Sequence, residues 1–193
     1  MSSPAETLLE GDILLYPTDT LYGLGVDALN SEAIKRLKEL KGRDEGKPIS
    51  VIISDMEMAE TYAEVTPLAK RLAERFLPGK LTIILNAKNL HDELTGGTGT
   101  IGIRIPNHVF CLALAKEFGR PYTATSANIA GEESKRSVPE ILAQFGEKAG
   151  GIGKVIDAGE LMESLPSTVV DARGNRPIVV REGAVPKDKI LDA

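Results

Sequence analysis

Hydroxyl and cationic side chains gather where predicted strands and helices end, and this pattern carries the clearest chemical meaning. An apolar run, Ile13–Tyr16, stops at Pro17 as a short buried strand would, and a turn rich in hydroxyl groups follows it. A helix is predicted over Ser31–Lys41 and ends at Gly42. Hydroxyl groups at a strand end that face cations at a helix end suit a ligand with both polar and anionic parts.

The candidate binding residues share two properties: each is a cation or a hydrogen-bonding group, and each lies near the end of a predicted element. The polar members are Thr18, Thr20, Tyr22, Ser126, Asn128, Ser134 and Ser167, and the cations are Lys41, Arg43, Lys47, Arg104 and Arg181. Several cations that lie beside apolar strands and helices in an acidic protein indicate a pocket for a polyanion. Any one of them could equally be a solvated surface residue, so the prediction depends on the whole set.

Length and composition limit the class of protein. With 193 residues and 42% hydrophobic content, the chain predicts one domain, residues 1–193, with a real core. A net charge of −5 argues against nucleic-acid binding driven by the overall field. Cys111 is the single cysteine, which excludes an intramolecular disulfide and fits a reducing compartment. With no signal-peptide pattern and no long apolar run, we expect a cytoplasmic protein without membrane contact.

Short helices between strands, without strict alternation, predict an α/β fold with one twisted, mixed parallel and antiparallel sheet flanked by helices. Several strand pairs have links too short for a crossover helix, so part of the sheet must be antiparallel. The predicted helices are Ala5–Leu9, Ser31–Lys41, Met56–Tyr62, Pro67–Phe76, His108–Phe118 and Pro139–Phe145. The predicted strands are Ile13–Tyr16, Val26–Ala28, Ile49–Ile53, Leu81–Leu85, Ile101–Ile105, Tyr122–Thr125, Val155–Asp157, Thr168–Val170 and Ile178–Val180.

Familiar catalytic motifs do not account for the polar residues. Gly97, Gly99 and Gly102 match G-x-G-x-x-G but precede a strand, so they indicate an anion-binding turn or a flexible hairpin loop rather than a dinucleotide site. No P-loop sequence is present. Two histidines and one cysteine predict neither a zinc site nor a Cys-His dyad, and we expect no protein-held metal. Ser126 has no evident base and is not predicted to be a nucleophile.

A set of short motifs, in this order and spacing, resembles the YrdC-like family of threonylcarbamoyl-AMP synthases in its short, single-domain form. The motifs are PTDTLYGLG at 17–25, KGR at 41–43, PGKLT at 78–82, GTIGIRIP at 99–106, SAN at 126–128 with Gly131 and Ser134, STVVD at 167–171 and REG at 181–183. Each motif alone is weak, but together they cover nearly the whole chain.

This resemblance implies a reaction and a fold. The fold would carry a concave, positively lined cavity. L-Threonine, bicarbonate and ATP would give threonylcarbamoyl-AMP and pyrophosphate, with Mg²⁺ bound to the phosphates. The product would pass to a tRNA threonylcarbamoyl transferase complex that makes N6-threonylcarbamoyladenosine at position 37. The synthase itself would bind tRNA weakly or not at all.

The resemblance also assigns residues. A catalytic tetrad would comprise Lys41, Arg43, Ser126 and Asn128; ATP contacts would be Arg43, Lys47, Thr100, Ser126, Ser134 and Arg181; threonine contacts would be Thr18, Thr20, Tyr22, Arg104, Ala124 and Ser167. Two positions depart from the longer, two-domain members: Lys47 stands where those have Asn, and Ile52 where those have a threonine-contacting His.

The chemistry agrees with these residue types, because a carbamate anion must attack the α-phosphate of an anionic nucleotide. Such a site needs cations and precise positioning, and no covalent nucleophile. Three alternatives remain open at this point. They are a carbamoyl-adenylate-forming domain of the hydrogenase-maturation type, a paralogue with altered activity, and a double-stranded RNA-binding module.

Overall fold

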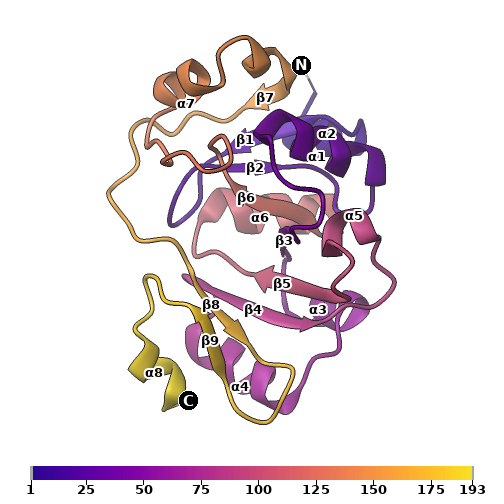
Figure 1. Cartoon of the computed structure of the whole chain (residues 1–193), viewed down its shortest axis with the longest axis vertical. Coiled ribbons are helices and arrows are strands. Elements are labelled where there is room, and N and C mark those ends of the chain that lie inside the picture. Colours follow the sequence, from indigo (N-terminus) through magenta and orange to yellow (C-terminus); the bar gives the residue numbers. More distant parts are fainter. Residues whose placement is uncertain (1, 193) are drawn as a thin grey trace.

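The computed structural model describes residues 2–192 and is built on one nine-stranded sheet with helices packed on its faces (Figure 1). The strand order is β7-β1-β2-β6-β3-β5-β4-β8-β9. The strands are β1 Ile13–Tyr16, β2 Gly23–Gly25, β3 Ser50–Ile52, β4 Leu81–Asn86, β5 Thr100–Arg104, β6 Tyr122–Ser126, β7 Ile152–Val155, β8 Thr168–Asp171 and β9 Ile178–Arg181. Pairs β1–β7, β3–β5 and β4–β8 are parallel and the other pairs are antiparallel, which confirms the predicted mixed sheet.

The helices begin and end where capping groups satisfy their free backbone groups. Helix α2 starts after Asn30, whose side chain accepts a hydrogen bond from the Ala33 amide, and it ends at Gly42 with a φ of 60°. The helices are α1 Pro4–Leu9, α2 Ser31–Lys41, α3 Met56–Tyr62, α4 Pro67–Phe76, α5 Asp92–Thr95, α6 Val109–Phe118, α7 Val138–Phe145, the 3₁₀ turn η1 Gly146–Gly151, and α8 Lys187–Leu191. Within residues 2–192, none of the helices has the length and apolar character needed to cross a membrane.

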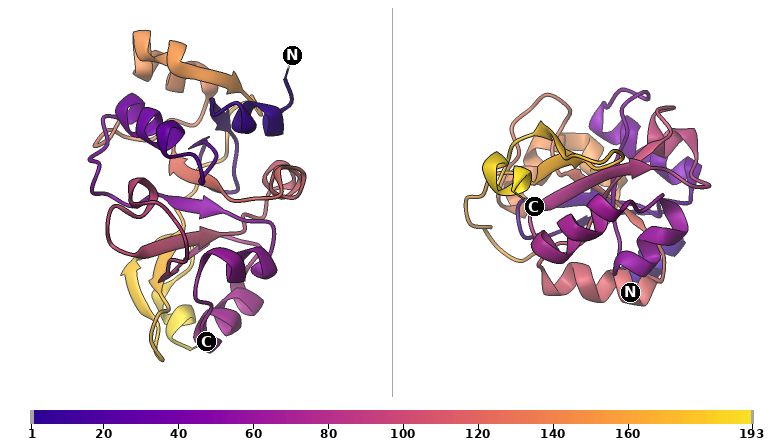
Figure 2. Two further views of the ribbon diagram at one scale, coloured as in Figure 1. Left: turned by 90° about the vertical axis from the view of Figure 1, so that its right-hand side faces the viewer. Right: turned by 90° about the horizontal axis from the view of Figure 1, so that it is seen from below.

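Two apolar clusters fill the two faces of the sheet. Side chains alternate along β1, so Ile13 and Leu15 join the larger cluster while Leu14 and Tyr16 join the smaller one. All four are buried, as expected for a strand covered on both sides. Helix α2 packs on the larger cluster and α6 on the smaller, and the left view of Figure 2 shows these helices on opposite sides of the sheet.

Several element boundaries differ from the sequence prediction. The second strand is Gly23–Gly25 rather than Val26–Ala28, because the β1–β2 hairpin pairs Leu15 with Leu24. Glycine is required there: a Cβ on Gly23 or on Gly25 would come within 2.9 Å of the Tyr16 ring. The seventh strand is Ile152–Val155 rather than Val155–Asp157. Elements α5, η1 and α8 were not predicted.

Candidate functional site

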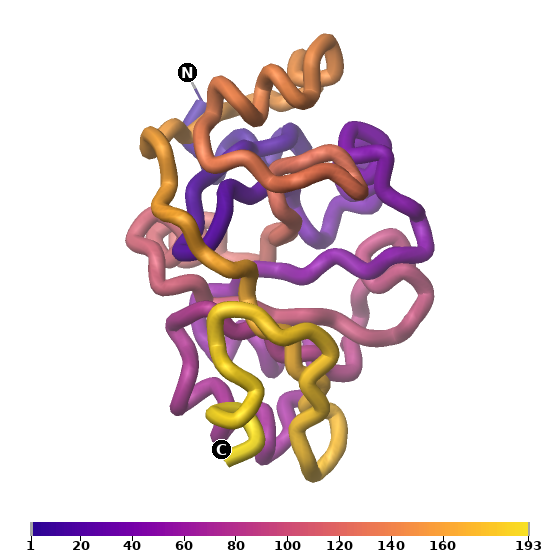
Figure 3. Tube along the Cα trace, turned by 60° about the vertical axis from the view of Figure 1, so that its left-hand side comes forward, coloured from indigo at the N-terminus to yellow at the C-terminus, as the bar shows by residue number. Residues whose placement is uncertain are grey.

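A cavity of about 520 Å³ lies over the central strands of the sheet. Tyr16 belongs to the smaller apolar cluster and also lines this cavity, so the cavity continues the face of the sheet that α6 partly covers. The predicted site residues that line it are Thr18, Thr20, Tyr22, Arg43, Arg104, Ala124, Ser126, Ser134, Ser167 and Arg181. Segments far apart in the chain therefore meet at one place, and Figure 3 shows the C-terminal strands lying beside the central part of the chain.

Strand pairing explains how two of these segments meet. Gly23 at the start of β2 pairs with Ser126 at the end of β6, so the hydroxyl-rich turn after β1 lies beside the Ser126–Asn128 turn. At the other side of the cavity, β8 pairs with β9 so that Val169 is opposite Arg181. The Arg181 guanidinium donates a 2.8 Å hydrogen bond to the Ser167 carbonyl, which holds Arg181 against the cavity wall.

Arg104 is fixed by a carboxylate that the sequence prediction left out of the site. Its Nη2 atom lies 3.1 Å from Asp19 Oδ1 and 3.3 Å from Thr20 Oγ1. The second oxygen of Asp19 accepts a 2.9 Å hydrogen bond from the Asn107 amide. Only 11% of the Arg104 side chain and 6% of the Asp19 side chain are exposed. This pair orients the guanidinium, and the buried Nε atom of Arg104 has no hydrogen-bond partner among residues 2–192.

All four of the predicted threonine-contacting hydroxyls have protein partners, and two of them, those of Thr18 and Tyr22, also hold the local chain. The Thr18 hydroxyl donates to the Leu21 carbonyl at 2.6 Å and accepts from the amides of Thr20 and Leu21, so it shapes the turn. The Tyr22 hydroxyl donates to the Gly159 carbonyl at 2.8 Å and accepts from the Ala158 amide, and burial raises its pKa. Both residues line the cavity, and both also hold the local chain in place.

Lys41 lies behind the cavity wall and not in it. Its side chain is almost fully buried, and its ammonium donates to the carbonyls of Ser126 and Asn128, the latter at 2.6 Å. Burial, and next the nearby Arg43, lowers the pKa of Lys41 to about 7. Asn128 is buried beside it and is likewise absent from the wall. The predicted tetrad is therefore brought together, but only Arg43 and Ser126 line the cavity.

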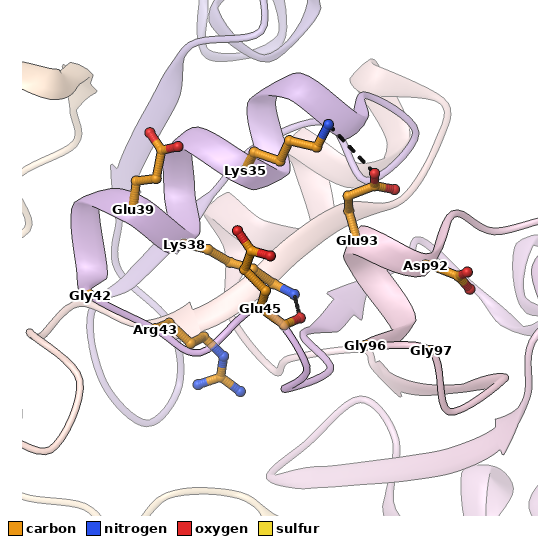
Figure 4. Close-up of a pocket in the computed structure, with 10 residues that line it drawn as sticks. All are labelled: Lys35, Lys38, Glu39, Gly42, Arg43, Glu45, Asp92, Glu93, Gly96 and Gly97. Carbon is orange, nitrogen blue, oxygen red and sulfur yellow. Dashed lines mark hydrogen bonds and ion pairs between the residues drawn. The ribbon is translucent and has the colours of Figure 1, made fainter.

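Arg43 stands where two cavities meet. Its Nη2 atom donates a 2.8 Å hydrogen bond to the Pro48 carbonyl, and its buried Nε has no partner within the described residues. Burial lowers the pKa of this guanidinium. The second cavity, of about 370 Å³, lies between α2 and α5; Figure 4 shows the Arg43 side chain pointing away from both of these helices.

The second cavity does not match the predicted site. Its other charged side chains have both signs: Lys35 lies 3.6 Å from Glu93, and the buried Lys38 ammonium donates to the Glu45 carbonyl (Figure 4). Arg43 is the residue that both cavities share.

Two predicted ATP contacts do not line the main cavity. Lys47 is exposed on the turn before β3. Thr100 begins β5, four residues before Arg104, and its hydroxyl lies 2.8 Å from that of Thr98. Four residues along a strand span about 13 Å, which separates Thr100 from the Arg104 end of the cavity. Their contact with ATP stays a prediction.

Other lining residues were missed by the sequence prediction. Thr82 stands in the PGKLT motif, and its hydroxyl lies 2.8 Å from that of Ser167. Among the described residues of the wall, Glu133 is the one that carries a carboxylate. Ile52, at the position where longer members have His, is fully buried in the smaller apolar cluster and does not reach the wall.

The chemistry that this cavity supports is the binding of anions. Three guanidinium groups, those of Arg43, Arg104 and Arg181, line it together with several hydroxyls. The Ser126 hydroxyl donates to the Asn128 amide oxygen rather than to a base, which does not activate it as a nucleophile. Within residues 2–192, no group of three His, Cys, Asp or Glu side chains is arranged to hold a metal ion. Fold and site thus define an α/β protein whose mixed sheet carries a cavity lined by three guanidinium groups and several hydroxyls.

Comparison with known proteins identifies the family. The model of the Sua5/YciO/YrdC family, described as "Telomere recombination", matches residues 6–183, and the chain belongs to this family. The resemblance predicted from the motifs is therefore confirmed.

Relatives of this chain include both short and long proteins. A relative from Methanocaldococcus jannaschii is 39% identical over 183 residues, which cover 95% of this chain and 85% of the relative. The threonylcarbamoyl-AMP synthase of Pyrococcus abyssi is 38% identical over 183 residues. This chain spans 53% of the Pyrococcus protein, or about half of its length.

Solved structures agree with the sequence comparison. The crystal structure of P. abyssi Sua5 complexed with L-threonine matches with a TM-score of 0.90 at 37% identity, over 97% of this chain and 55% of that one. The E. coli YciO structure matches with a TM-score of 0.85 at 29% identity, over 97% of this chain and 90% of that one. These matches confirm the predicted fold class.

Proposed function

We propose that this protein is an L-threonylcarbamoyladenylate synthase, which converts L-threonine, bicarbonate and ATP to threonylcarbamoyl-AMP and pyrophosphate. The observation that carries the proposal is the cavity wall, where the guanidinium groups of Arg43, Arg104 and Arg181 gather together with several hydroxyls. Guanidinium groups in a cavity wall can bind the carboxylate of an amino acid and the phosphates of a nucleotide. The Pyrococcus relative is named threonylcarbamoyl-AMP synthase, and this name supports the proposed reaction.

In this proposal the two ends of the cavity take different substrates. Threonine lies at the Arg104 end, near Thr20, Ala124 and Ser167. ATP extends from the Arg43 end, near Ser126 and Ser134, toward Arg181, which is hydrogen-bonded to Ser167 and so lies next to the threonine. A guanidinium can hold a carboxylate or a phosphate through two parallel hydrogen bonds, which suits both ligands.

The proposed chemistry uses charge and position. The threonine amine and bicarbonate first give a carbamate and water. A carbamate oxygen then attacks the α-phosphorus, a new O–P bond forms, and the bond to the bridging oxygen of the β-phosphate breaks to release pyrophosphate. Arg43 and Arg181 would stabilise the charge that develops on the phosphates, and Arg104 would hold the threonine carboxylate in line.

Mg²⁺ would enter with the triphosphate. No cluster of three acidic, His or Cys side chains is present in the described part of the chain, so the ion would be held by phosphate oxygens and water. It would neutralise phosphate charge, and the protein groups do the positioning.

The direct test is the substrate requirement for pyrophosphate release. We expect release from ATP to need both threonine and bicarbonate, with radiolabelled bicarbonate appearing in the adenylate product. Serine and valine serve as controls for the amino acid. Release that needed carbamoyl phosphate in place of threonine and bicarbonate would contradict this proposal and favour the hydrogenase-maturation type of reaction.

A second prediction concerns the handover of the product. We propose that a separate tRNA threonylcarbamoyl transferase complex in the cytoplasm consumes the adenylate. The net charge of −5 predicts that the isolated protein binds tRNA weakly, with a small dependence on salt. Titration of labelled tRNA at several salt concentrations checks this. A tight complex at physiological salt with a steep salt dependence would support direct RNA recognition instead.

A further inference from the structure

We propose that Lys41 and Asn128 are positioning residues, which act through Ser126 and do not themselves contact the nucleotide. The inference rests on the proposed function, because Ser126 is taken to face the ATP end of the cavity. It follows from how the hydrogen-bonding capacity of the three side chains is used.

The ammonium group of Lys41 has three N–H donors, and the Ser126–Asn128 turn accounts for all three. They reach the Ser126 carbonyl, the Asn128 carbonyl at 2.6 Å and the Asn128 Oδ1 atom at 3.5 Å. The side chain is 2% exposed and does not line the cavity. A phosphate contact would require Lys41 to leave these oxygens, and two buried carbonyls would lose a hydrogen bond.

The amide of Asn128 is equally occupied. Its Nδ2 group donates to the carbonyls of Ile129 and Glu132, at 2.9 and 2.7 Å. Its Oδ1 atom accepts from Lys41 and from the Ser126 hydroxyl. Because every partner of Nδ2 is an acceptor and every partner of Oδ1 is a donor, the amide orientation is determined by its surroundings. No donor or acceptor remains for a ligand.

These bonds decide what Ser126 offers to the cavity. The Ser126 hydroxyl donates to Asn128 Oδ1, which lies 2.5 Å from the hydroxyl oxygen, so the lone pairs of that oxygen are left for the cavity side. Ser126 is then a hydrogen-bond acceptor. It can accept from a ribose hydroxyl or from the amino group of the base, but it cannot donate to a phosphate oxygen without breaking the bond to Asn128. Lys41 helps to keep Ser126 an acceptor, because it holds Asn128 Oδ1, the oxygen to which the Ser126 hydroxyl donates, in place.

A double-mutant cycle tests the positioning role. We expect Lys41→Met to lower kcat/KM for ATP by roughly tenfold or more, and by less than about threefold when Ser126→Ala is already present, because residues that act as a unit are not additive. A direct phosphate contact would give the same loss in both backgrounds and would overturn the proposal. The matched control is Lys38→Met, which removes a buried ammonium from the same helix that donates to the Glu45 carbonyl. Its effect should not depend on Ser126.

A second arm does not require the Lys41 variant to fold. Three ATP analogues, each lacking one donor, are compared: 2′-deoxy-ATP, 3′-deoxy-ATP and the purine riboside triphosphate that lacks the amino group. We expect one of them to lose about as much kcat/KM as Ser126→Ala does, and to show no further loss with the Ser126→Ala protein. If all three lose the same factor with both proteins, Ser126 is not an acceptor and the proposal fails.

Failure of the proposed function would look different. The wild-type protein would then release no pyrophosphate with threonine and bicarbonate. The positioning role would still be tested by thermal melting of the Lys41→Met, Asn128→Ala and double variants. The loss in melting temperature of the double variant should be clearly smaller than the sum of the two single losses. Additive losses would contradict it.

Discussion

Replacing Arg43 with alanine should lower the turnover of adenylate formation by about a hundredfold, and Arg43→Lys should lose most of the activity although the charge is kept. Arg43 lines the ATP end of the cavity with a buried Nε that has no protein partner in the described structure. A planar guanidinium can grip a phosphate through two bonds, whereas an ammonium is a point charge. A contact that strengthens as charge builds on the α-phosphate is worth about 3 kcal/mol, and it should affect kcat more than the KM for threonine.

Stability measurements separate this effect from misfolding. Arg43 is half-buried rather than exposed and donates one hydrogen bond to the Pro48 carbonyl, so Arg43→Ala should cost about 1 kcal/mol of unfolding free energy. Arg36→Ala is the matched control, because Arg36 lies on α2 and donates to the Gly11 carbonyl. Adenylate formation and thermal melting are measured on the same samples. Normal turnover in a normally melting Arg43→Ala protein would remove Arg43 from the site.

Replacing Arg104 with lysine should raise the KM for threonine by about a hundredfold with a smaller change in kcat. Arg104 lines the cavity and uses Nη2 for Asp19 and Thr20, which leaves the accessible part of the guanidinium for the ligand. Lysine has one nitrogen and cannot serve both sides with this geometry. Asp19→Asn should act in the same direction with a smaller effect, because the guanidinium keeps an oxygen partner but is held less firmly in its orientation by a neutral amide.

The control for this prediction is another arginine–carboxylate pair. Arg120 lies 3.3 Å from Asp27 and neither residue lines the cavity, so Arg120→Lys should leave the KM for threonine unchanged. Steady-state kinetics with threonine varied at saturating ATP provide the measurement. An Arg104→Lys protein whose KM for threonine stayed within about twofold of wild type would show that another group binds the carboxylate.

The predicted element bounds were right where the apolar pattern was strong. They were wrong where a contact between distant residues determines which residues form the element. Strand β1 and helix α2 have the predicted bounds, because one is a continuous apolar run and the other has a clear cap at each end. Strand β2 was misplaced, because three residues with two glycines carry no strand signal; the Tyr16 ring, and at Gly25 also the Thr123 carbonyl, explain why glycine is needed there. Helix α5 spans four residues, too few for a periodic pattern.

The candidate site was predicted in outline. Many of the predicted residues line one cavity, since pairing brings the ends of β2 and β6 together, and their roles stay predictions. The sequence could not tell which of two cations lines the cavity and which is buried behind its wall, because Lys41 and Arg43 are two positions apart and have the same charge. Their different burial depends on the turn after α2 and on the carbonyls of the Ser126–Asn128 turn. Asp19 was overlooked, because its role appears only when Arg104 arrives from a distant strand.

The wall of the cavity runs from Tyr16 in β1 to Arg181 in β9, and these strands stand at positions two and nine in the sheet order. The two substrates together would therefore span strands that are held next to one another only by contacts between residues distant in the chain. Such contacts form late and slow the folding of a chain. Once they have formed, ligand binding should protect backbone amides across the whole sheet from hydrogen exchange, and not only those beside the ligand, because opening either end would dismantle the binding surface.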